Sequence, residues 1–137
     1  MTTAVKRKSG RQSVRWAYLD VVLANAATGT DVEMIELPQG AIVVDGFVSV
    51  TEVYNSTSSD VLDIGDSGSE NRYKNDVNLQ ALGLTALVPT GYVYTAPTRI
   101  TARWVSGGGT PTTGAYTLAV AYIVKGLADL GPQGLDT

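Results

Sequence analysis

The sequence contains no cysteine and no histidine among its 137 residues. Without cysteine the chain has no disulfide, no thiolate nucleophile and no thiolate metal ligand, which is typical of a protein made in a reducing cytoplasm. Without histidine it lacks the commonest proton shuttle near neutral pH and the commonest transition-metal ligand. A Ser-His-Asp triad, a Cys-His dyad and a zinc hydrolase site are therefore excluded within one chain. We predict that the protein is not an enzyme and holds no cofactor.

Long apolar runs are also missing. No stretch of 18 apolar residues occurs, so no segment is expected to span a membrane. The basic start of the chain is not followed by an apolar stretch, so we do not interpret it as a signal peptide. Apolar residues make up 44% of the chain and charged residues 17%, which is typical of a globular domain long enough to bury a core.

Acidic residues are absent from the first fifteen positions. The basic residues there are Lys6, Arg7, Lys8, Arg11 and Arg15. The rest of the chain has five basic against thirteen acidic residues, a net charge of −8. This basic arm is either a solvated terminus or a segment that docks on an acidic partner or on nucleic acid phosphates. The acidic body argues against broad nucleic acid binding.

The remaining chain divides into a body and a tail. Residues 126–137 contain three glycines and a proline and have no periodicity, so they are predicted to form a tail. We therefore expect a flexible basic arm at 1–13, one β-sandwich domain at 14–125 and a C-terminal tail at 126–137.

The segment from Leu37 to Asp66 predicts two strands. It opens with a Pro-Gln-Gly turn, and from Val44 onward apolar and polar residues alternate, with Val44, Val48 and Val50 on one face. A run of Ser, Thr and Asn then predicts a loop before the second strand. Further strands are predicted at 14–24, 30–37, 71–75, 84–88, 91–95, 98–106 and 115–125.

Two details of this pattern deserve separate predictions. The apolar phase shifts within residues 14–24, which predicts either a bulge near Tyr18–Asp20 or burial on both faces. The strand at 115–125 has large apolar residues on one face and small ones on the other, which is typical of a central strand or a subunit contact.

Asp76–Leu82 is predicted to form one or two helical turns, with Asp76 as N-cap and Gly83 as the stop.

About eight or nine strands with almost no helix predict an all-β, antiparallel two-sheet sandwich. Its simplest form is jelly-roll-like, with extended N- and C-terminal tails. An eight-stranded barrel is the alternative.

Two loops have candidate ligand sites. Asp60, Asp63, Asp66 and Glu70 form an acidic cluster whose oxygens suit Ca²⁺, although the spacing does not match an EF-hand. We favour a solvated acidic turn in which Asp66 bonds its own loop backbone. The glycines at 107–109 lack the following Lys-Ser/Thr of a phosphate loop, and a hairpin turn is favoured. No catalytic, cofactor-binding or metal-binding residue is predicted.

Aromatic and basic side chains are the other candidates. Trp16, Trp104 and the seven tyrosines would suit a sugar groove, but their strand phase favours core packing or a subunit interface. Arg99 and Arg103 share a strand face, with acids such as Asp20 or Asp63 as candidate partners. Across a subunit interface such pairs would set register and specificity.

Three phrases carry a resemblance to a known class of proteins. They are LPQGAIVVDGFVSV, DVLDIGD with Asn-Arg-Tyr at 71–73, and GYVYTAPTRITARWVSGGGTPTTGAYTLAVAYI. They lie within the run from Leu37 to Lys125, which is about two thirds of the chain, and this run resembles the small β-sandwich proteins that decorate or cement the heads of tailed bacteriophages. The resemblance implies a jelly-roll-like dimer or trimer, made in the host bacterial cytoplasm and located on the outer capsid surface. There it bridges neighbouring major capsid protein subunits and stabilises the head.

The candidate partner-binding residues under this hypothesis are basic. They are Lys6, Arg7, Lys8, Arg11, Arg15, Arg99 and Arg103. Expected partners are the major capsid protein and further copies of the chain, with no membrane and no nucleic acid. The alternative is a carbohydrate-binding or adhesion β-sandwich of a phage particle, based on the tyrosine and tryptophan content. A carboxylate-only enzyme such as a glycosidase is ranked last, because it needs two acids about 5 to 10 Å apart in a cleft.

Overall fold

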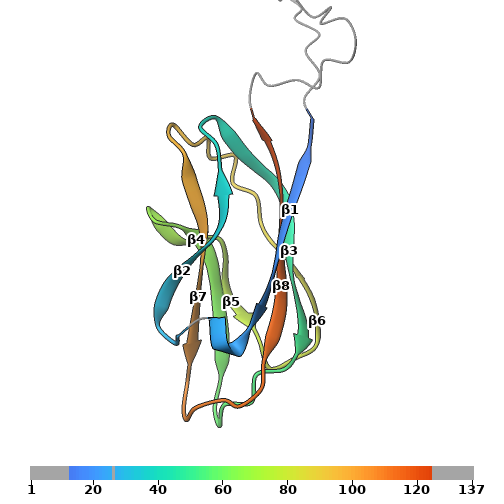
Figure 1. The fold of residues 1–137 in the computed structure, drawn as a ribbon, viewed down its shortest axis with the longest axis vertical. Helices are drawn as coiled ribbons and strands as arrows, with labels where there is room; N and C mark the ends of the chain where they lie inside the picture. The colour runs from blue at the N-terminus through green and yellow to red at the C-terminus, as the bar shows by residue number, and fades with distance from the viewer. Residues whose placement is uncertain (1–12, 26, 125–137) are drawn as a thin grey trace, which may run out of the picture.

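The computed structural model describes residues 13–25 and 27–124, and this part of the chain is built from β-strands (Figure 1). One short 3-10 helix, η1 (Leu23–Asn25), follows the first strand. The eight strands are β1 (Arg15–Val22), β2 (Thr30–Leu37), β3 (Ala41–Glu52), β4 (Asp60–Asp66), β5 (Ser69–Asn78), β6 (Gly83–Ala86), β7 (Thr98–Ser106) and β8 (Ala115–Val124). The arm at 1–12 and the residues from 125 onward lie outside the described residues, so the division into arm, body and tail stays a prediction.

The strands form two four-stranded antiparallel sheets that face each other. One sheet has the order β1-β8-β3-β6 and the other the order β2-β7-β4-β5. In both, first strands pair with last: β1 with β8, β2 with β7, β3 with β6 and β4 with β5. This nested pairing is the arrangement of an eight-stranded jelly roll. The predicted all-β sandwich is confirmed, and two separate sheets replace the barrel alternative.

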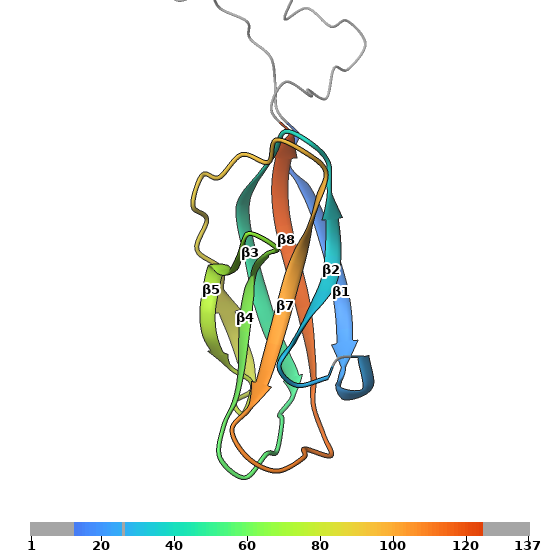
Figure 2. The ribbon, with the colours of Figure 1, turned by 90° about the vertical axis from the view of Figure 1, so that its left-hand side faces the viewer.

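Figure 2 looks onto the β2-β7-β4-β5 sheet, with the other sheet behind it. The core fills the space between the two sheets. Alternate residues of each strand point inward, so the period of two seen in the sequence becomes one buried face per strand. Leu37, Leu62, Ile64, Ile100 and Leu118 are fully buried. Burying each such side chain stabilises the fold by about 2 kcal/mol. The face of residues 115–125 that was expected to carry large apolar residues is buried at Tyr116, Leu118 and Val120.

Two sequence predictions about strand phase need correction. β1 pairs with β8 in unbroken register from Arg15 to Val22, so the expected bulge near Tyr18–Asp20 is absent. The alternative, burial on both faces, is wrong as well, because Val21 is the one buried residue of β1. In β3 the register shifts between Val43 and Asp45. That bulge turns Val43 into the core and leaves Val44 partly exposed, contrary to the prediction.

The predicted helical turn at Asp76–Leu82 is wrong. β5 continues to Asn78, and Asp76 has a φ of 55° at a point where two β5 residues lie opposite one β4 residue. Its N–H donates to the Asp63 carboxylate at 2.8 Å. Aspartate favours helix N-caps, but it also tolerates the left-handed conformation that such a bulge requires, so its presence did not distinguish the two.

The remaining loops were only partly anticipated. The strand expected at 84–88 is β6, whereas the one expected at 91–95 is reduced to a single bridge between Val93 and Ile42. The glycine loop at 107–109 joins β7 to β8, which belong to different sheets, so it is an arch and not a hairpin. The Gly107 N–H donates to the Ser59 carbonyl at 2.6 Å, which fixes this arch to the loop before β4.

Candidate functional site

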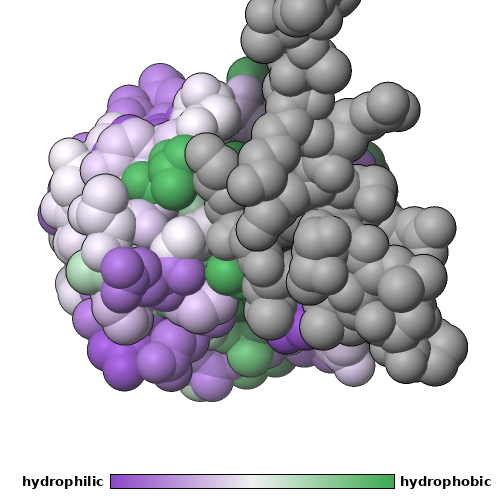
Figure 3. All heavy atoms as spheres, turned by 90° about the horizontal axis from the view of Figure 1, so that it is seen from above, coloured by the Kyte–Doolittle hydropathy of each residue, from purple (hydrophilic) through white to green (hydrophobic). Residues whose placement is uncertain are grey.

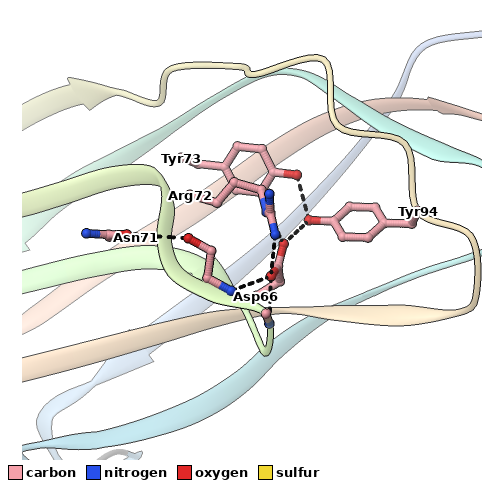
Figure 4. Close-up of polar contacts among 7 residues, drawn as sticks. Asp66, Asn71, Arg72, Tyr73 and Tyr94 are labelled. Atoms are coloured by element: carbon pink, nitrogen blue, oxygen red, sulfur yellow. Dashed lines mark hydrogen bonds and ion pairs between the residues drawn. The ribbon is translucent and has the colours of Figure 1, made fainter.

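A buried carboxylate network lies where β4 turns into β5 (Figure 4). Asp66 is the last residue of β4 and is 3% exposed. Its Oδ1 accepts the backbone N–H groups of Gly68 and Ser69, each at 2.9 Å. Its Oδ2 accepts the Tyr94 hydroxyl at 2.7 Å and pairs with the Arg72 guanidinium. The expected bonding of Asp66 to its own turn is confirmed, but the expectation of a solvated turn is wrong because Asp66 is buried. Its bonds to Arg72 and Tyr94 were not foreseen.

Aromatic rings surround this carboxylate. The Tyr73 and Tyr94 hydroxyls are 2.6 Å apart, and the Arg72 guanidinium carbon lies 3.8 Å from the centre of the Tyr92 ring. Burial opposes ionisation of Asp66, but the bonds from Arg72, Tyr94 and Ser69 outweigh it, so the pKa of Asp66 lies below its ordinary value. The pKa of Tyr94 is raised by burial and by its bonds to Tyr73 and Asp66, so its hydroxyl keeps its proton.

A second buried carboxylate lies at the other end of β4. Asp60 is fully buried and accepts the Ser56 N–H and hydroxyl, the Gln80 amide and the Trp104 indole N–H, at 2.7 to 3.0 Å. Burial opposes ionisation of Asp60, but these four bonds lower its pKa overall. Burial, and then the charge of Asp60, raise the pKa of Tyr54 to about 12.

Both networks act on the fold. Asp60 ties the loop before β4 to the turn after β5 and to β7, whereas Asp66 ties the β4–β5 turn to the segment around Tyr94. They stand at opposite ends of a seven-residue strand, roughly 20 Å apart at the usual rise per residue. That separation exceeds the range of a glycosidase carboxylate pair. Every oxygen of both carboxylates is also occupied by a donor of the chain itself.

The acidic cluster of the sequence is dispersed by the fold. Asp60 and Asp66 are buried in separate networks, Asp63 accepts a backbone N–H, and Glu70 pairs with Arg103. Among residues 13–25 and 27–124, no three acidic side chains come together as a group that could hold a metal ion.

The candidate basic residues fall into three groups. Arg99 pairs with Glu33 at 3.0 Å, and Arg103 pairs with Asp31 at 3.2 Å and Glu70 at 2.7 Å. Their partners are therefore acids of β2 and β5, not the expected Asp20 and Asp63. Arg15 lies exposed at the start of β1. The other candidates, Lys6, Arg7, Lys8 and Arg11, lie outside the described residues.

The outer face of the sheet β1-β8-β3-β6 is apolar and aromatic. Residues paired across antiparallel strands share a face. Trp16 and Tyr18 therefore lie beside Ala121 and Ala119 of β8, and Phe47 lies on the other side of Ala119. Trp16 is 54% and Tyr18 72% exposed, whereas both alanines are buried beneath the neighbouring rings. The sequence favoured core packing or a subunit interface for the tryptophans. Trp104 lies in the core, whereas Trp16 is exposed, and its place in an interface stays a prediction.

The outer face of the sheet β2-β7-β4-β5 is charged. It holds the Arg99 and Arg103 ion pairs together with an excess of acids. A hollow of about 280 Å³ on this face is lined by Glu33, Glu36, Arg99, Thr101 and neighbouring residues, with no aromatic side chain. This hollow therefore lacks the ring that would stack on a sugar, and the exposed rings of Trp16 and Tyr18 lie on the other sheet.

The end of the sandwich where β1 begins and β8 ends differs from both faces. Seen from above, its coloured residues are mostly hydrophilic or weakly polar, with hydrophobic residues in small separate groups (Figure 3). Extended apolar surface is therefore a property of the β1-β8-β3-β6 sheet and not of the visible part of this end.

The fold and its contacts define a jelly-roll sandwich whose distinguishing features are two contrasting outer faces. No helix in the described part of the chain has the length and hydropathy needed to cross a membrane. No protein-family model matches the sequence, and no curated protein matches it either.

Three solved structures share the fold. A chain of the cyanophage Pam1 capsid asymmetric unit matches with a TM-score of 0.66 and 23% identity, over 90% of this chain and 93% of that one. A chain of the acid-stable capsid of Helicobacter pylori bacteriophage KHP30 matches with a TM-score of 0.61 and 19% identity, over 80% and 86%. A chain of the Ralstonia phage GP4 capsid matches with a TM-score of 0.61 and 17% identity, over 81% and 84%. The chain thus has the fold of chains found in phage capsid structures.

Proposed function

We propose that this chain is a structural protein of a tailed-phage virion that decorates and cements the outer surface of the capsid. In this role it bridges neighbouring major capsid protein subunits and strengthens the head against the pressure of the packaged DNA. The observation that carries the proposal is that fold similarity extends over most of this chain and most of each capsid-structure chain. Because the similarity covers most of both chains, it favours a common architecture of the whole domain over the similarity of one short motif.

The chemistry of the described residues supports the same role. The oxygens of each buried carboxylate accept hydrogen bonds that hold loops and strands together, which suits a rigid sandwich. A cement protein works by binding the assembled shell more tightly than its separate parts, which stabilises the shell by mass action. Many copies on a symmetric shell add avidity to modest individual contacts. The role therefore requires adhesive surfaces and a stable body, and no reaction.

The proposed contacts are with the major capsid protein and with further copies of the chain. The basic arm at 1–13 and the tail at 126–137 are proposed to extend from the sandwich to neighbouring subunits. Arg15, Arg99 and Arg103 remain proposed partner-binding residues. The latter two already hold acids of their own chain, so in our proposal they contribute by fixing the charged face and less by reaching outward.

Deleting the gene from the phage that encodes the chain tests this proposal. Purified wild-type particles are expected to contain the chain in a fixed ratio to the major capsid protein, measured by mass spectrometry. Particles made without it are expected to release DNA at a lower temperature, measured by dye uptake during heating. Absence of the chain from purified particles, together with unchanged heat resistance, would overturn the proposal.

Carbohydrate binding by a virion adhesion module is the second candidate. The exposed rings of Trp16 and Tyr18 favour it, because aromatic side chains on a flat sheet can stack on sugar rings. Trp16 fluorescence during titration with host surface glycans tests it, with Trp16→Ala as the control that should lose the signal. A saturable change would favour adhesion, and an unchanged spectrum would count against it.

A further inference from the structure

The four edge strands of the sandwich are not equally protected against pairing with another strand. Sheet edges expose unpaired N–H and C=O groups, and proteins usually block them by shortness, bulges or charge. β6 has only four residues. β5 has two register shifts along β4. β2 has a shift between Glu33 and Ile35 and carries Asp31, Glu33 and Glu36. Three of the four edges thus have a recognisable block.

β1 is neither short nor bulged, and its two charged residues, Arg15 and Asp20, stand near its ends. It is eight residues long, and its register with β8 is unbroken from Arg15 to Val22. It contains no proline, glycine or lysine. β1 has a partner strand, β8, on one side only. In such an antiparallel pair every second residue of β1 bonds to β8, so the N–H and C=O groups of the residues in between point away from the sheet. Within the described residues, no backbone hydrogen bond outside the sheet ladders involves residues 14–21.

The side chains of β1 are also exposed in a way that is unusual for apolar residues. Five of the twelve large hydrophobic residues that are exposed in the described chain lie at positions 14–22. They are Val14, Trp16, Tyr18, Leu19 and Val22. They occupy both faces of the strand, so a strand added to this edge would cover apolar surface above and below the sheet. At the far end the Asn25 side chain accepts the Val22 N–H at 2.9 Å, which closes the free edge there.

The two charges of β1 indicate which strand fits this edge. Arg15 stands at its start and Asp20 near its end. Asp20 accepts the Thr117 hydroxyl, and no ion pair involves either residue among those described. A second copy of β1 running antiparallel brings the Arg15 end of each strand beside the Asp20 end of the other, so opposite charges meet at the level of the strand ends while the two side chains point to opposite faces of the sheet. The contact is then made twice by one two-fold axis, as in an isologous dimer.

We infer that β1 is a self-association edge, at which β1 of a second copy of the chain pairs antiparallel to join two four-stranded sheets into one of eight strands. The inference rests on the self-association included in the proposed function and adds the surface that makes it. It does not depend on the capsid, because it concerns two copies of this chain in solution.

Sedimentation velocity of the full chain over a concentration series tests the inference. We expect a dimer that dissociates on dilution. Tyr18→Lys replaces the most exposed aromatic ring of β1 with a positive charge. We expect it to raise the dissociation constant of the dimer by at least about tenfold. Leu84→Lys is the matched control, because Leu84 is 64% exposed on β6, at the opposite edge of the same sheet. It should leave the dimer unchanged, and both variants should unfold at the wild-type temperature at concentrations low enough for the wild-type chain to be monomeric.

Cross-linking gives an independent readout, because the chain has no cysteine of its own. Tyr18→Cys should form a covalent dimer with a short bismaleimide, and Leu84→Cys should not. A chain that associates, but is dissociated by Leu84→Lys and not by Tyr18→Lys, would overturn the β1 edge while leaving self-association intact. A chain that is monomeric at every concentration would overturn both the edge and the self-association on which it rests.

Discussion

The two sheets of this sandwich share a core but present opposite outer surfaces. The sheet β2-β7-β4-β5 carries the ion pairs of Arg99 and Arg103 and contains both buried carboxylates, Asp60 and Asp66. The sheet β1-β8-β3-β6 presents Trp16, Tyr18 and small alanines on its outer face. The first sheet bonds its arginines and its buried carboxylates within the chain, whereas the second, among the described residues, leaves apolar surface and an unpaired strand edge exposed to solvent.

This difference separates what holds the protein together from what it offers to partners. Buried, fully hydrogen-bonded groups contribute to stability and are costly to disturb. Exposed apolar side chains contribute little to the stability of a single chain, but large exposed apolar patches commonly mark protein–protein interfaces. Changes in the β2-β7-β4-β5 sheet should therefore alter unfolding, and changes at β1 should alter association.

The largest effect is expected from Asp66→Ala. It leaves Arg72, Tyr94 and two backbone N–H groups without their acceptor, and we expect a loss of about 3 kcal/mol in the free energy of unfolding. Urea denaturation followed by tryptophan fluorescence measures it. Asp63→Ala is the control from the same strand and should cost less than about 1 kcal/mol. Equal losses for the two variants would show that the Asp66 network does not hold this end of the sandwich.

Acid should unfold the protein through the same two carboxylates. The pKa values of Asp60 and Asp66 are lowered in the folded state. Their contribution to stability is therefore complete above the unfolded-state pKa of about 4 and is lost as the pH falls through the lower folded-state values. Urea midpoints measured from pH 7 to pH 2 should decline below about pH 4. A double Asp60→Asn, Asp66→Asn variant should be less stable at pH 7 and show a flatter decline, and an unflattened decline would contradict this assignment.

A smaller effect separates the two arginines of the charged face. Arg103 bonds Glu70 and the Gly29 carbonyl and lies 3.2 Å from Asp31, so Arg103→Ala should cost about 1 kcal/mol. Arg99 has one exposed partner, and Arg99→Ala should cost less than about 0.5 kcal/mol. Thermal unfolding of the two variants in parallel tests the order. A larger loss for Arg99→Ala would mean that the cross-strand links of Arg103 do not stabilise the sheet.

The smallest effect on stability is expected from deleting residues 1–12. The strands and core of the sandwich lie within the described residues, so the truncated chain should unfold at the wild-type temperature by calorimetry. Its attachment to capsids should be weaker at low salt, and the deficit should shrink as salt screens the lost positive charges. A truncated chain that fails to fold would show instead that the arm is part of the structure.

Much of the fold could be predicted from the sequence because strand periodicity survives where one face of a strand is buried. The alternation in β7 and β8 led directly to the observed buried faces. Prediction was wrong at bulges, because one inserted residue reverses the phase. Val44 and Asp76 both lie at such places. No local pattern marks these positions, since the register is decided by the partner strand.

The polar networks were less predictable than the strands. The turn bonds of Asp66 follow from its own sequence neighbours, but its bond to Tyr94 joins residues 28 positions apart. The exposure of Trp16 also depends on its strand being at a sheet edge, which the sequence pattern alone does not show. The apolar residues on both faces of residues 115–125 were a usable signal, because they predicted a central strand or a subunit contact and β8 lies in the centre of its sheet, between β1 and β3.

The central claim is that the chain is a capsid-binding structural protein, and binding to capsids that lack it tests this most directly. The purified full chain would be added to particles made without its gene, and bound chain per particle measured by quantitative mass spectrometry after sedimentation. The account predicts saturable binding at a fixed ratio to the major capsid protein, with heat resistance restored. Absence of binding at any concentration, with the chain folded and the particles intact, would contradict it.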